Sequence, residues 1–453
     1  MGDSANLVVS TRPPMPSSGP PLVFKNVRAI DPRVGLDAEI DVVIEKGIIS
    51  RAGRGAATSF EGLAVARVIE GSGRWLLPAF VDLHAHLREP GHEYKEDITS
   101  GLKAAAAGGY AHICVMPNTK PVNDTRAVTE MMLRRAAEVG GTKLHPIGAI
   151  TRGQAGQELT EMAELRAAGA VAVSDDGVCV MSSAVMRRAL EYARNFDLPV
   201  IQHAEDHELT LGAQMNEGVT STRLGLRGWP RIAEDVIIAR DVLIAEYVKA
   251  RYHAAHISTA GAARIVREAK SRGLPVTCEV TPHHLLLTDA AVIGYETACK
   301  VNPPLREESD IEALQNALAD GTIDAIATDH APHSSLEKDC EFEEASPGIM
   351  GLELCFGLLL DLVSRSPLTL PRLIDALSTA PARIVGLTPP SIREGALAEV
   401  VLVSPEATWV PATESLACKS RNTPFLKHTL KGRVLLTVAD GVIAFDGLRA
   451  QPS

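Results

Sequence analysis

Two histidines separated by one residue, His84 and His86, could together hold a metal ion. They close an apolar run of strand length that begins at Trp75, and a charged loop broken by proline and glycine follows them. Alternate residues of a strand point to the same face, so the two imidazoles should project side by side. Two buried histidines bonded to backbone are the commoner meaning of an isolated His-x-His pair. Histidine and aspartate at further strand ends favour the metal interpretation here.

The elements that must position these side chains alternate between strand-like and helical patterns over residues 75–388. Eight strands separated by helices predict a parallel sheet that closes into a barrel, and the length suits a barrel with loop insertions. We therefore expect an α/β fold, a (β/α)8 TIM-like barrel. The predicted strands are residues 76–83, 111–116, 144–150, 170–174, 199–202, 252–257, 275–280 and 322–327, and the predicted helices are residues 99–107, 128–139, 158–168, 183–195, 233–248, 259–272 and 309–319.

Short β-type runs at both ends of the chain predict a second, smaller domain. Residues 22–74 and 389–453 contain these runs, separated by turn signals such as Lys46-Gly47 and Asp440-Gly441. We expect both segments to pair into one small β-sandwich domain beside the barrel. Residues 1–21 are rich in proline and serine and predict a disordered leader, because they cannot bury enough apolar area to offset the entropy of ordering.

The strand ends of the predicted barrel gather four histidines and two aspartates at one mouth. In barrels of this kind the catalytic groups lie at the C-terminal ends of the strands. A single strand-end aspartate more often caps a helix, but capping does not explain the histidines. Imidazole and carboxylate ligands without thiolate suit zinc in a hydrolytic site. The pattern does not decide whether Asp175 or Asp176 is the ligand. We interpret His283-His284, after the seventh predicted strand, as part of a structural turn. The candidate ligands are His84, His86, Asp175 or Asp176, His203, His256 and Asp329.

The overall composition excludes several classes of partner. The 453 residues carry a net charge of −11 without a basic cluster, and only 4% are aromatic, which argues against nucleic acid. No apolar run reaches the roughly 20 residues of a membrane-spanning helix, and the start of the chain lacks the pattern of a secretion signal. The seven cysteines form no C-x-x-C pair, which predicts free thiols in a reducing cytoplasm.

Several motifs resemble those of the dihydroorotases of the amidohydrolase superfamily, in particular the bacterial class with this two-domain layout. The most specific motif is Leu87-Arg88-Glu89-Pro90-Gly91, directly after the histidine pair. The resemblance covers nearly the whole chain. The other motifs are Met116-Pro117-Asn118-Thr119, Ser174-Asp175-Asp176-Gly177, Asn302-Pro303-Pro304-Leu305-Arg306, Asp329-His330-Ala331-Pro332-His333, Pro347-Gly348-Ile349-Met350-Gly351 and Ser420-Arg421-Asn422-Thr423-Pro424-Phe425.

The resemblance implies a zinc-dependent cyclic amide hydrolase that interconverts N-carbamoyl-L-aspartate and L-dihydroorotate in UMP biosynthesis. Asp329 would serve as general base and then as general acid. Residues 333–347 would form a mobile loop over the site. The implied metal ligands are His84, His86 and Asp329 for one zinc ion, His203 and His256 for a second, and Asp176, at the family's matching position, as the bridge between them.

The same resemblance implies a site for an acidic substrate. An arginine suits this site because its planar guanidinium pairs with a carboxylate through two parallel hydrogen bonds. It also implies a homo-oligomer and a possible aspartate transcarbamoylase partner. The implied substrate-binding residues are His86, Leu87, Arg88, Asn118, Asn302, His333, Pro347 and Gly348.

Two departures and two alternatives accompany this resemblance. Related enzymes often carry a carboxylated lysine between the two metal ions at the end of the fourth strand, and residues 171–176 contain no lysine. The sequence therefore leaves open whether the site binds one zinc ion or two. Residues 394–400 depart from the family's pattern in the small domain. A sister hydrolase of hydantoin, dihydropyrimidine or allantoin would not need the cation of Arg88. A non-catalytic scaffold for aspartate transcarbamoylase would not need every ligand position filled.

Overall fold

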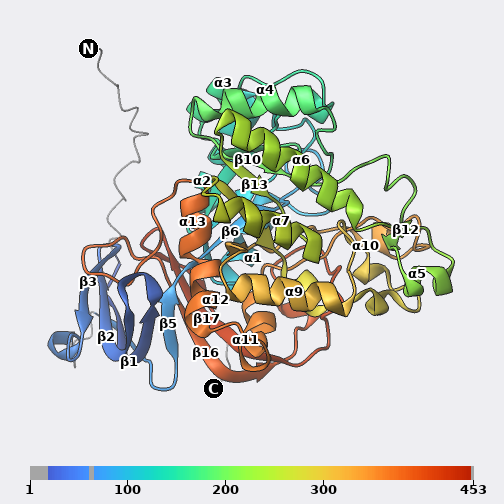
Figure 1. The fold of residues 1–453 in the computed structure, drawn as a ribbon. Coiled ribbons are helices and arrows are strands. Elements are labelled where there is room, and N and C mark those ends of the chain that lie inside the picture. Colours follow the sequence, from blue (N-terminus) through green and yellow to red (C-terminus); the bar gives the residue numbers. More distant parts are fainter. Residues whose placement is uncertain (1–18, 61–65, 450–453) are drawn as a thin grey trace, which may run out of the picture.

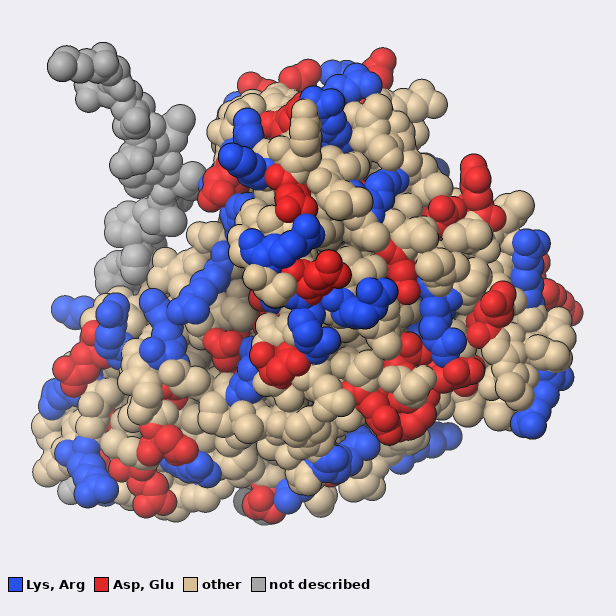
Figure 2. Space-filling model, in the orientation of Figure 1, with Lys and Arg blue, Asp and Glu red and all other residues tan. Residues whose placement is uncertain are grey.

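The computed structural model describes residues 19–60 and 66–449 and divides them between a barrel and a second sheet (Figure 1). Most of the expected leader, residues 1–18, lies outside the described residues. Within the described part of the chain, no helix is both long and apolar enough to cross a membrane. On the face drawn in Figure 2, basic and acidic side chains alternate, and neither sign gathers over one element.

The barrel consists of eight parallel strands, each paired with its neighbour in chain order. A bridge between Ala85 and His330 joins the last strand to the first, and the His86 N–H donates to the His330 carbonyl at 2.9 Å. The predicted barrel is confirmed. Its strands are β6 (Phe80–Ala85), β7 (Tyr110–Val115), β8 (Lys143–Gly148), β9 (Ala172–Ser174), β10 (Val200–Gln202), β13 (Tyr252–Ala254), β14 (Val276–Val280) and β15 (Ala325–Ile326).

Helices cover the outside of this barrel, and α4, α6, α7 and α9 follow one another across the view in Figure 1. Their start signals are local: the Asp97 carboxylate accepts from the Ser100 N–H at 2.7 Å at the first of them. The helices are α1 (Ile98–Ala107), α2 (Arg126–Val139), α3 (Met162–Ala168), α4 (Ser183–Arg194), α6 (Ile232–Val248), α7 (Ala260–Ser271), α9 (Glu308–Ala319), α11 (Cys355–Arg365), α12 (Leu370–Leu377) and α13 (Thr379–Ile384).

The loops at the mouth carry shorter elements. They include α8, which begins directly after β14, and α10, which lies between the last strand and α11. These elements are β11 (Met215–Asn216), α5 (Val219–Leu224), β12 (Gly228–Trp229), α8 (Pro282–Leu286) and α10 (Ser335–Lys338).

The second sheet is built from both ends of the chain, as predicted. Its strand order is β18-β17-β16-β5-β1-β2-β3, with β4 paired to β1, so β5 joins the N-terminal strands to the C-terminal ones. Side chains from both halves of the sheet share one apolar core, which makes the domain a sandwich. The strands are β1 (Leu22–Asp31), β2 (Leu36–Glu45), β3 (Ile48–Gly53), β4 (Arg67–Glu70), β5 (Trp75–Pro78), β16 (Val400–Trp409), β17 (Leu430–Ala439) and β18 (Val442–Asp446).

The run predicted as one strand, residues 76–83, is two strands in different sheets. β5 pairs with β16 and β1, whereas β6 pairs with β7 of the barrel. The chain passes from one sheet to the other at Ala79. The Ala79 N–H donates to the Glu399 carbonyl at 3.0 Å, and the Phe80 N–H donates to the Gly109 carbonyl at 2.9 Å. The sequence could not reveal this break, because both halves are buried and equally apolar.

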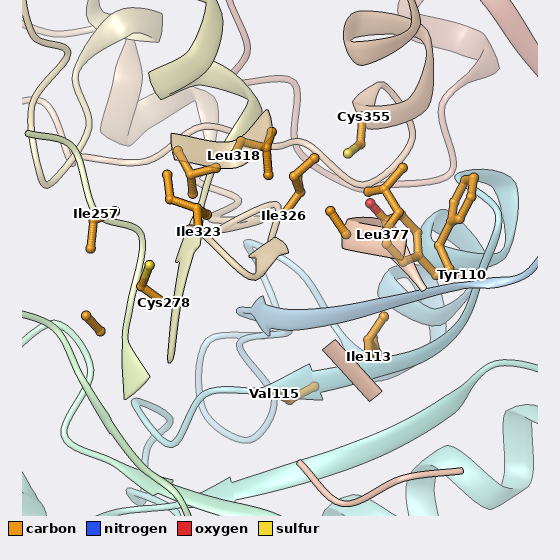
Figure 3. Close-up of a cluster of buried hydrophobic side chains, with 14 of the residues drawn as sticks. Tyr110, Ile113, Val115, Ile257, Cys278, Leu318, Ile323, Ile326, Cys355 and Leu377 are labelled. Carbon is orange, nitrogen blue, oxygen red and sulfur yellow. The ribbon is translucent and has the colours of Figure 1, made fainter. Parts of the chain in front are cut away.

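Buried apolar side chains fill the space between the barrel strands and the helices. Phe80 and Tyr110 meet edge to face with ring centroids 5.6 Å apart, and both are almost fully buried. This packing holds β6 and β7 rigidly beneath the mouth. Figure 3 shows part of the cluster, including Tyr110, Ile113, Val115, Ile257, Cys278, Leu318, Ile323, Ile326, Cys355 and Leu377.

Candidate metal and active site

Asp176 lies at the centre of four imidazoles at the C-terminal mouth of the barrel. One carboxylate oxygen, Oδ1, is 3.2 Å from His84 Nε2, 3.6 Å from His256 Nε2 and 3.8 Å from His203 Nδ1. The other oxygen is 3.5 Å from His86 Nε2. The loop after β9 thus brings its carboxylate to the ends of β6, β10 and β13 at once. All five side chains are buried.

Asp329, after β15, approaches the same cluster from the opposite side. Its Oδ1 is 3.1 Å from His86 Nε2 and 3.6 Å from His84 Nε2. Burial would raise the pKa of Asp329, but the adjacent histidines lower it, so this carboxyl is ionised. The structure therefore brings together all six residues proposed from the sequence as metal ligands.

The neighbouring aspartate, Asp175, points away from the cluster. Its carboxylate accepts from the Ile150 and Thr151 N–H groups at 2.8 and 3.0 Å and from the Thr151 hydroxyl. Burial raises the pKa of Asp175 to about 6. Since adjacent residues of an extended chain point to opposite sides, only Asp176 can face the histidines. The alternative that the sequence left open is resolved by this geometry.

The cluster has a deficit of positive charge. Four carboxylates, those of Asp176, Asp329, Glu205 and Glu279, contact its imidazoles, and among the described residues no lysine or arginine forms an ion pair with any of them. Burial alone would lower the pKa of His84, yet the Asp176, Glu279 and Asp329 carboxylates raise it well above its ordinary value. A buried anionic cluster of this kind is costly unless a cation neutralises it.

Two buried polar atoms at the centre have no hydrogen-bond partner. They are His84 Nε2 and Asp176 Oδ1, and they face each other. Buried polar atoms are almost always paired in folded proteins, so two unpaired atoms that face each other suit a bound cation between lone pairs. Imidazole nitrogens and carboxylate oxygens converging on one space match the ligands of zinc. The residues present therefore fit a bound metal ion.

Three residues at the mouth have backbone φ angles in the left-handed region, which residues other than glycine rarely adopt. They are Arg88 (φ 61°), His256 (φ 30°) and Asp329 (φ 43°). Such conformations cost of order 1–3 kcal/mol each and gather at functional sites. They turn the side chains into the mouth immediately after the strands end.

Arg88 lies half-buried at the edge of the cluster. Its Nε donates to the Pro332 carbonyl at 3.2 Å, and its Nη2 is 3.4 Å from His333 Nε2. Among the described residues no carboxylate forms an ion pair with this guanidinium. The guanidinium is therefore free to take an acidic ligand beside the imidazole cluster.

Asn118 bonds directly to two of the predicted ligands. Its Oδ1 is 2.9 Å from His86 Nδ1, and its Nδ2 donates to Asp176 Oδ2 at 3.3 Å. An amide oxygen accepts, so it fixes the proton on His86 Nδ1 and leaves Nε2 as the ligating nitrogen. The structure gives Asn118 a part in orienting the cluster beside the substrate contact that the resemblance implied.

His333, Pro347 and Gly348 form one unit held by Asn422. The Asn422 side chain accepts from the His333 N–H at 3.0 Å and donates to the Gly348 carbonyl at 3.0 Å. Burial, followed by the charges of Arg88 and two lysines, lowers the pKa of His333 to about 2, so its ring is neutral. Its Nε2 lies 2.9 Å from the Pro347 carbonyl and donates to it.

The segment between His333 and Pro347 is anchored by two buried lysines. The Lys338 ammonium donates to the carbonyls of Thr297 and Ser346 at 2.9 and 2.7 Å. The Lys300 ammonium donates to the Phe342 and Glu343 carbonyls and to the Gln214 side chain. Motion of this loop stays a prediction.

Leu87 and Asn302 offer less to a ligand than the other predicted residues. The Leu87 side chain is fully buried against Gly101 of α1, so only its backbone can reach the mouth. Asn302 is half-buried, next to Pro303, whose carbonyl accepts from His284 Nε2 at 3.0 Å. His284 is satisfied by this bond and by Thr281, which suits the structural turn predicted for it.

Sequence reasoning missed three groups that face the cluster. Glu279 contacts His84 Nδ1 at 2.9 Å and Glu205 contacts His203 Nε2 at 3.0 Å. His283, set aside as structural, is buried with an unpaired Nε2, and burial lowers its pKa to about 4. A charged residue within the predicted strand 275–280 was the available signal for Glu279, since buried carboxylates require partners.

A second group of possible ligands behind the mouth is satisfied by the protein itself. His330 Nε2 lies 3.7 Å from Cys418 Sγ and 3.8 Å from Glu96 Oε2. Its Nδ1 accepts from the Gly351 N–H at 3.2 Å, so the ring proton is on Nε2. A protonated Nε2 points at the thiol and carboxylate as a donor and is not a metal ligand.

The fold and the site together define the class of this protein. An eight-stranded parallel barrel whose strand ends gather four histidines and two aspartates, beside a small β-sandwich, is the architecture of a cyclic amidohydrolase. Solved structures agree in fold: L-hydantoinase (dihydropyrimidinase) from Arthrobacter aurescens has a TM-score of 0.83 at 20% identity, covering 94% of this chain and 96% of that one. D-hydantoinase (dihydropyrimidinase) from a Thermus species has a TM-score of 0.79 at 23% identity, with 94% and 95% covered.

Curated relatives narrow the class to one family. The dihydroorotase of Trichlorobacter lovleyi is 49% identical over 426 residues, 94% of this chain and 99% of that protein. The dihydroorotase of Anaeromyxobacter dehalogenans is 51% identical over 427 residues, with 94% and 98% covered. Residues 73–262 match the family described as Dihydro-orotase-like. The chain belongs to the dihydroorotase family and is an enzyme.

Proposed function

We propose that this enzyme interconverts N-carbamoyl-L-aspartate and L-dihydroorotate, a step of pyrimidine nucleotide synthesis. The observation that carries the proposal is Arg88, which has no carboxylate partner among the described residues and lies beside an imidazole–carboxylate cluster. A neutral cyclic amide would leave that half-buried cation without a counter-ion, whereas the carboxylate of dihydroorotate would pair with it. The family membership gives the same substrate independently.

The metal part of the proposal is a zinc site with one or two ions. His84, His86 and Asp329 would hold one ion and His203 and His256 the other, with Asp176 between them. Asp176 suits the bridging position because its two oxygens face all four imidazoles. Zinc bound there would lower the pKa of a water molecule and polarise the ring carbonyl.

Asp329 is the proposed proton carrier. In hydrolysis a water oxygen bonds to the ring carbonyl carbon, the ring C–N bond breaks, and the nitrogen needs a proton. An ionised carboxylate at the cluster can accept the proton from water and deliver it to that nitrogen. In the biosynthetic direction the same steps run backwards and water leaves.

The remaining residues would bind the substrate. Arg88 would pair with the carboxylate, and Asn118 and His333 would contact it from the sides. Asn302 and the backbone of residues 86–87 and 347–348 would contact the ring. To donate to the substrate carboxylate, the neutral His333 would have to turn its Nε2–H away from the Pro347 carbonyl.

Partners and location complete the proposal. A homo-oligomer and an aspartate transcarbamoylase partner stay predictions. A cytoplasmic location is supported by the cysteines, because all seven are free and six of them are buried.

The test compares acidic and neutral cyclic amides. The purified zinc-loaded enzyme should turn over L-dihydroorotate and N-carbamoyl-L-aspartate, and should leave dihydrouracil and hydantoin unchanged. Arg88→Met should raise KM for dihydroorotate by roughly 10- to 100-fold, as expected for loss of one charge-assisted pair of about 1.5–3 kcal/mol. Turnover of dihydrouracil alone would replace the proposal with a sister hydrolase. No turnover of any of these amides would favour a scaffold.

A further inference from the structure

A chain of hydrogen-bonding groups runs from His84 into the closed interior of the barrel. Glu279 on β14 faces two imidazoles at once: its Oε1 is 2.9 Å from His84 Nδ1, and its Oε2 is 3.2 Å from His253 Nε2. His253 Nδ1 is in turn 2.8 Å from the Thr277 hydroxyl. The side chains of His84, Glu279 and His253 are fully buried.

A neutral His84 has one tautomer that suits this contact. The Thr277 hydroxyl lies 2.8 Å from His253 Nδ1, and His253 Nε2 faces Glu279 Oε2 at 3.2 Å without forming a hydrogen bond. His84 Nδ1–H donates to Glu279 Oε1. His84 Nε2 then carries a lone pair, and this is the unpaired atom that faces Asp176. The carboxylate thus selects the tautomer of His84 that can bind a metal.

We propose that Glu279 and His253 are positioning residues for the metal site, with Glu279 acting through His84 and His253 acting through Glu279. The proposal rests on the proposed function, because it assumes a metal at His84. Glu279 fixes the ring of His84 and increases its basicity through the charge-assisted hydrogen bond. His253 lies against the second oxygen of Glu279, with its Nε2 3.2 Å from Oε2, and limits how that carboxylate can turn.

The negative charge of Glu279 suits its proposed role in positioning His84. Within the described residues no lysine or arginine pairs with it, so its negative charge is directed entirely at the two imidazoles. The carboxylate thus contacts one nitrogen of His84 while the other, Nε2, is buried and unpaired beside Asp176.

The first experiment measures zinc binding by Glu279→Gln. A glutamine presents one oxygen and one NH2 group, so it cannot accept from both imidazoles. The zinc dissociation constant, measured on the full chain by competition with a chromogenic chelator, should rise roughly 10- to 100-fold. The metal-free variant should keep a melting temperature close to that of the metal-free wild type, since the hydrogen-bonding shape is nearly retained.

The matched control is Glu399→Gln. Glu399 is also buried and also contacts a histidine, His112 Nε2, at 3.0 Å, but it lies in the contact between the barrel and the sandwich. The Glu399→Gln variant should have a melting temperature lowered equally in the metal-free and the zinc-loaded protein, and its zinc dissociation constant should equal that of the wild type. The pair of variants separates an effect on the metal from an effect on the fold.

A second pair of variants keeps the test decisive if Glu279→Gln does not fold. His253→Leu removes the imidazole that faces Glu279 Oε2 and should weaken zinc binding about 10-fold. His253→Gln restores an N–H donor and should recover most of that loss.

Two results would overturn the inference in distinguishable ways. Wild-type protein that binds no zinc would remove the metal site itself and this inference with it. Wild-type protein that binds zinc, with Glu279→Gln and His253→Leu binding it equally tightly, would leave the proposed function standing and reduce both residues to structural groups.

Discussion

One cluster of histidine and carboxylate side chains lies at the mouth of the barrel, and another lies toward the N-terminal ends of β7 and β8. At the N-terminal side, His112 Nδ1 is 2.9 Å from His145 Nε2, its Nε2 is 3.0 Å from Glu399, and Lys143 is 3.5 Å from the same glutamate. At the mouth, no lysine among the described residues pairs with the carboxylates that contact the imidazoles, and His84 Nε2 has no hydrogen-bond partner.

The difference shows how similar residue types serve two purposes. The N-terminal cluster contains its own cation, Lys143, and its histidine nitrogens have protein partners, so it fastens the barrel to the sandwich without a ligand. The mouth cluster is incomplete by charge and by hydrogen bonding, and its side chains could hold an added cation. Histidine next to carboxylate therefore indicates a metal site only where the protein leaves that group unsatisfied.

Metal removal should have the largest effect, and it should affect the mouth cluster but not the N-terminal cluster. Dialysis against a strong chelator should abolish turnover of dihydroorotate, because the mouth depends on a cation, and added Zn²⁺ should restore it. The contact between barrel and sandwich should stay intact, so far-ultraviolet circular dichroism should not change. Full activity in protein shown to be metal-free by mass spectrometry would contradict the comparison.

Replacement of Asp329 tests the mouth cluster next. Asp329→Ala removes the proposed proton carrier and one ligand, and kcat should fall by about 10³-fold or more in both directions. Metal content per chain, measured alongside, separates loss of the proton carrier from loss of zinc. Turnover near the wild-type rate would remove Asp329 from the mechanism.

Replacement of Glu399 tests the N-terminal cluster. Glu399→Gln leaves His112 and Lys143 without their carboxylate, and the free energy of unfolding should fall by about 1–3 kcal/mol. Urea denaturation of the metal-free protein measures this loss. Since the cluster lies away from the mouth, kcat and KM should equal those of the wild type, and a large change in either would show that the clusters are coupled.

The smallest effect is a pH dependence of stability. Burial would raise the pKa of Glu399, but His112 and Lys143 lower it below its ordinary value of 4.5. A carboxyl with a lowered pKa in the folded state stabilises the fold above that ordinary value and loses this contribution as the pH falls through its folded pKa. Unfolding free energy measured from pH 6 to pH 3 should therefore fall less steeply in Glu399→Gln. Parallel curves for the two proteins would contradict this assignment.

The sequence by itself determined the fold class and most of the site, because both depend on local patterns. Alternating strand and helix periods predict the barrel, and every predicted ligand stands at the end of a predicted strand. A spacing of two residues on a strand places His84 and His86 on one face whatever the rest of the chain does.

Only the tertiary structure decided the points that depend on register and on distant contacts. Residues 76–83 divide between two sheets because their partners, Glu399 and Gly109, come from opposite sides of Ala79. Asp176 faces the four imidazoles and Asp175 does not, because the hydrogen bonds of Asp175 to residues 150–151 fix which way the loop turns. The contact of Glu279 with His84 joins residues 195 positions apart, and no local pattern encodes which buried carboxylate meets which imidazole.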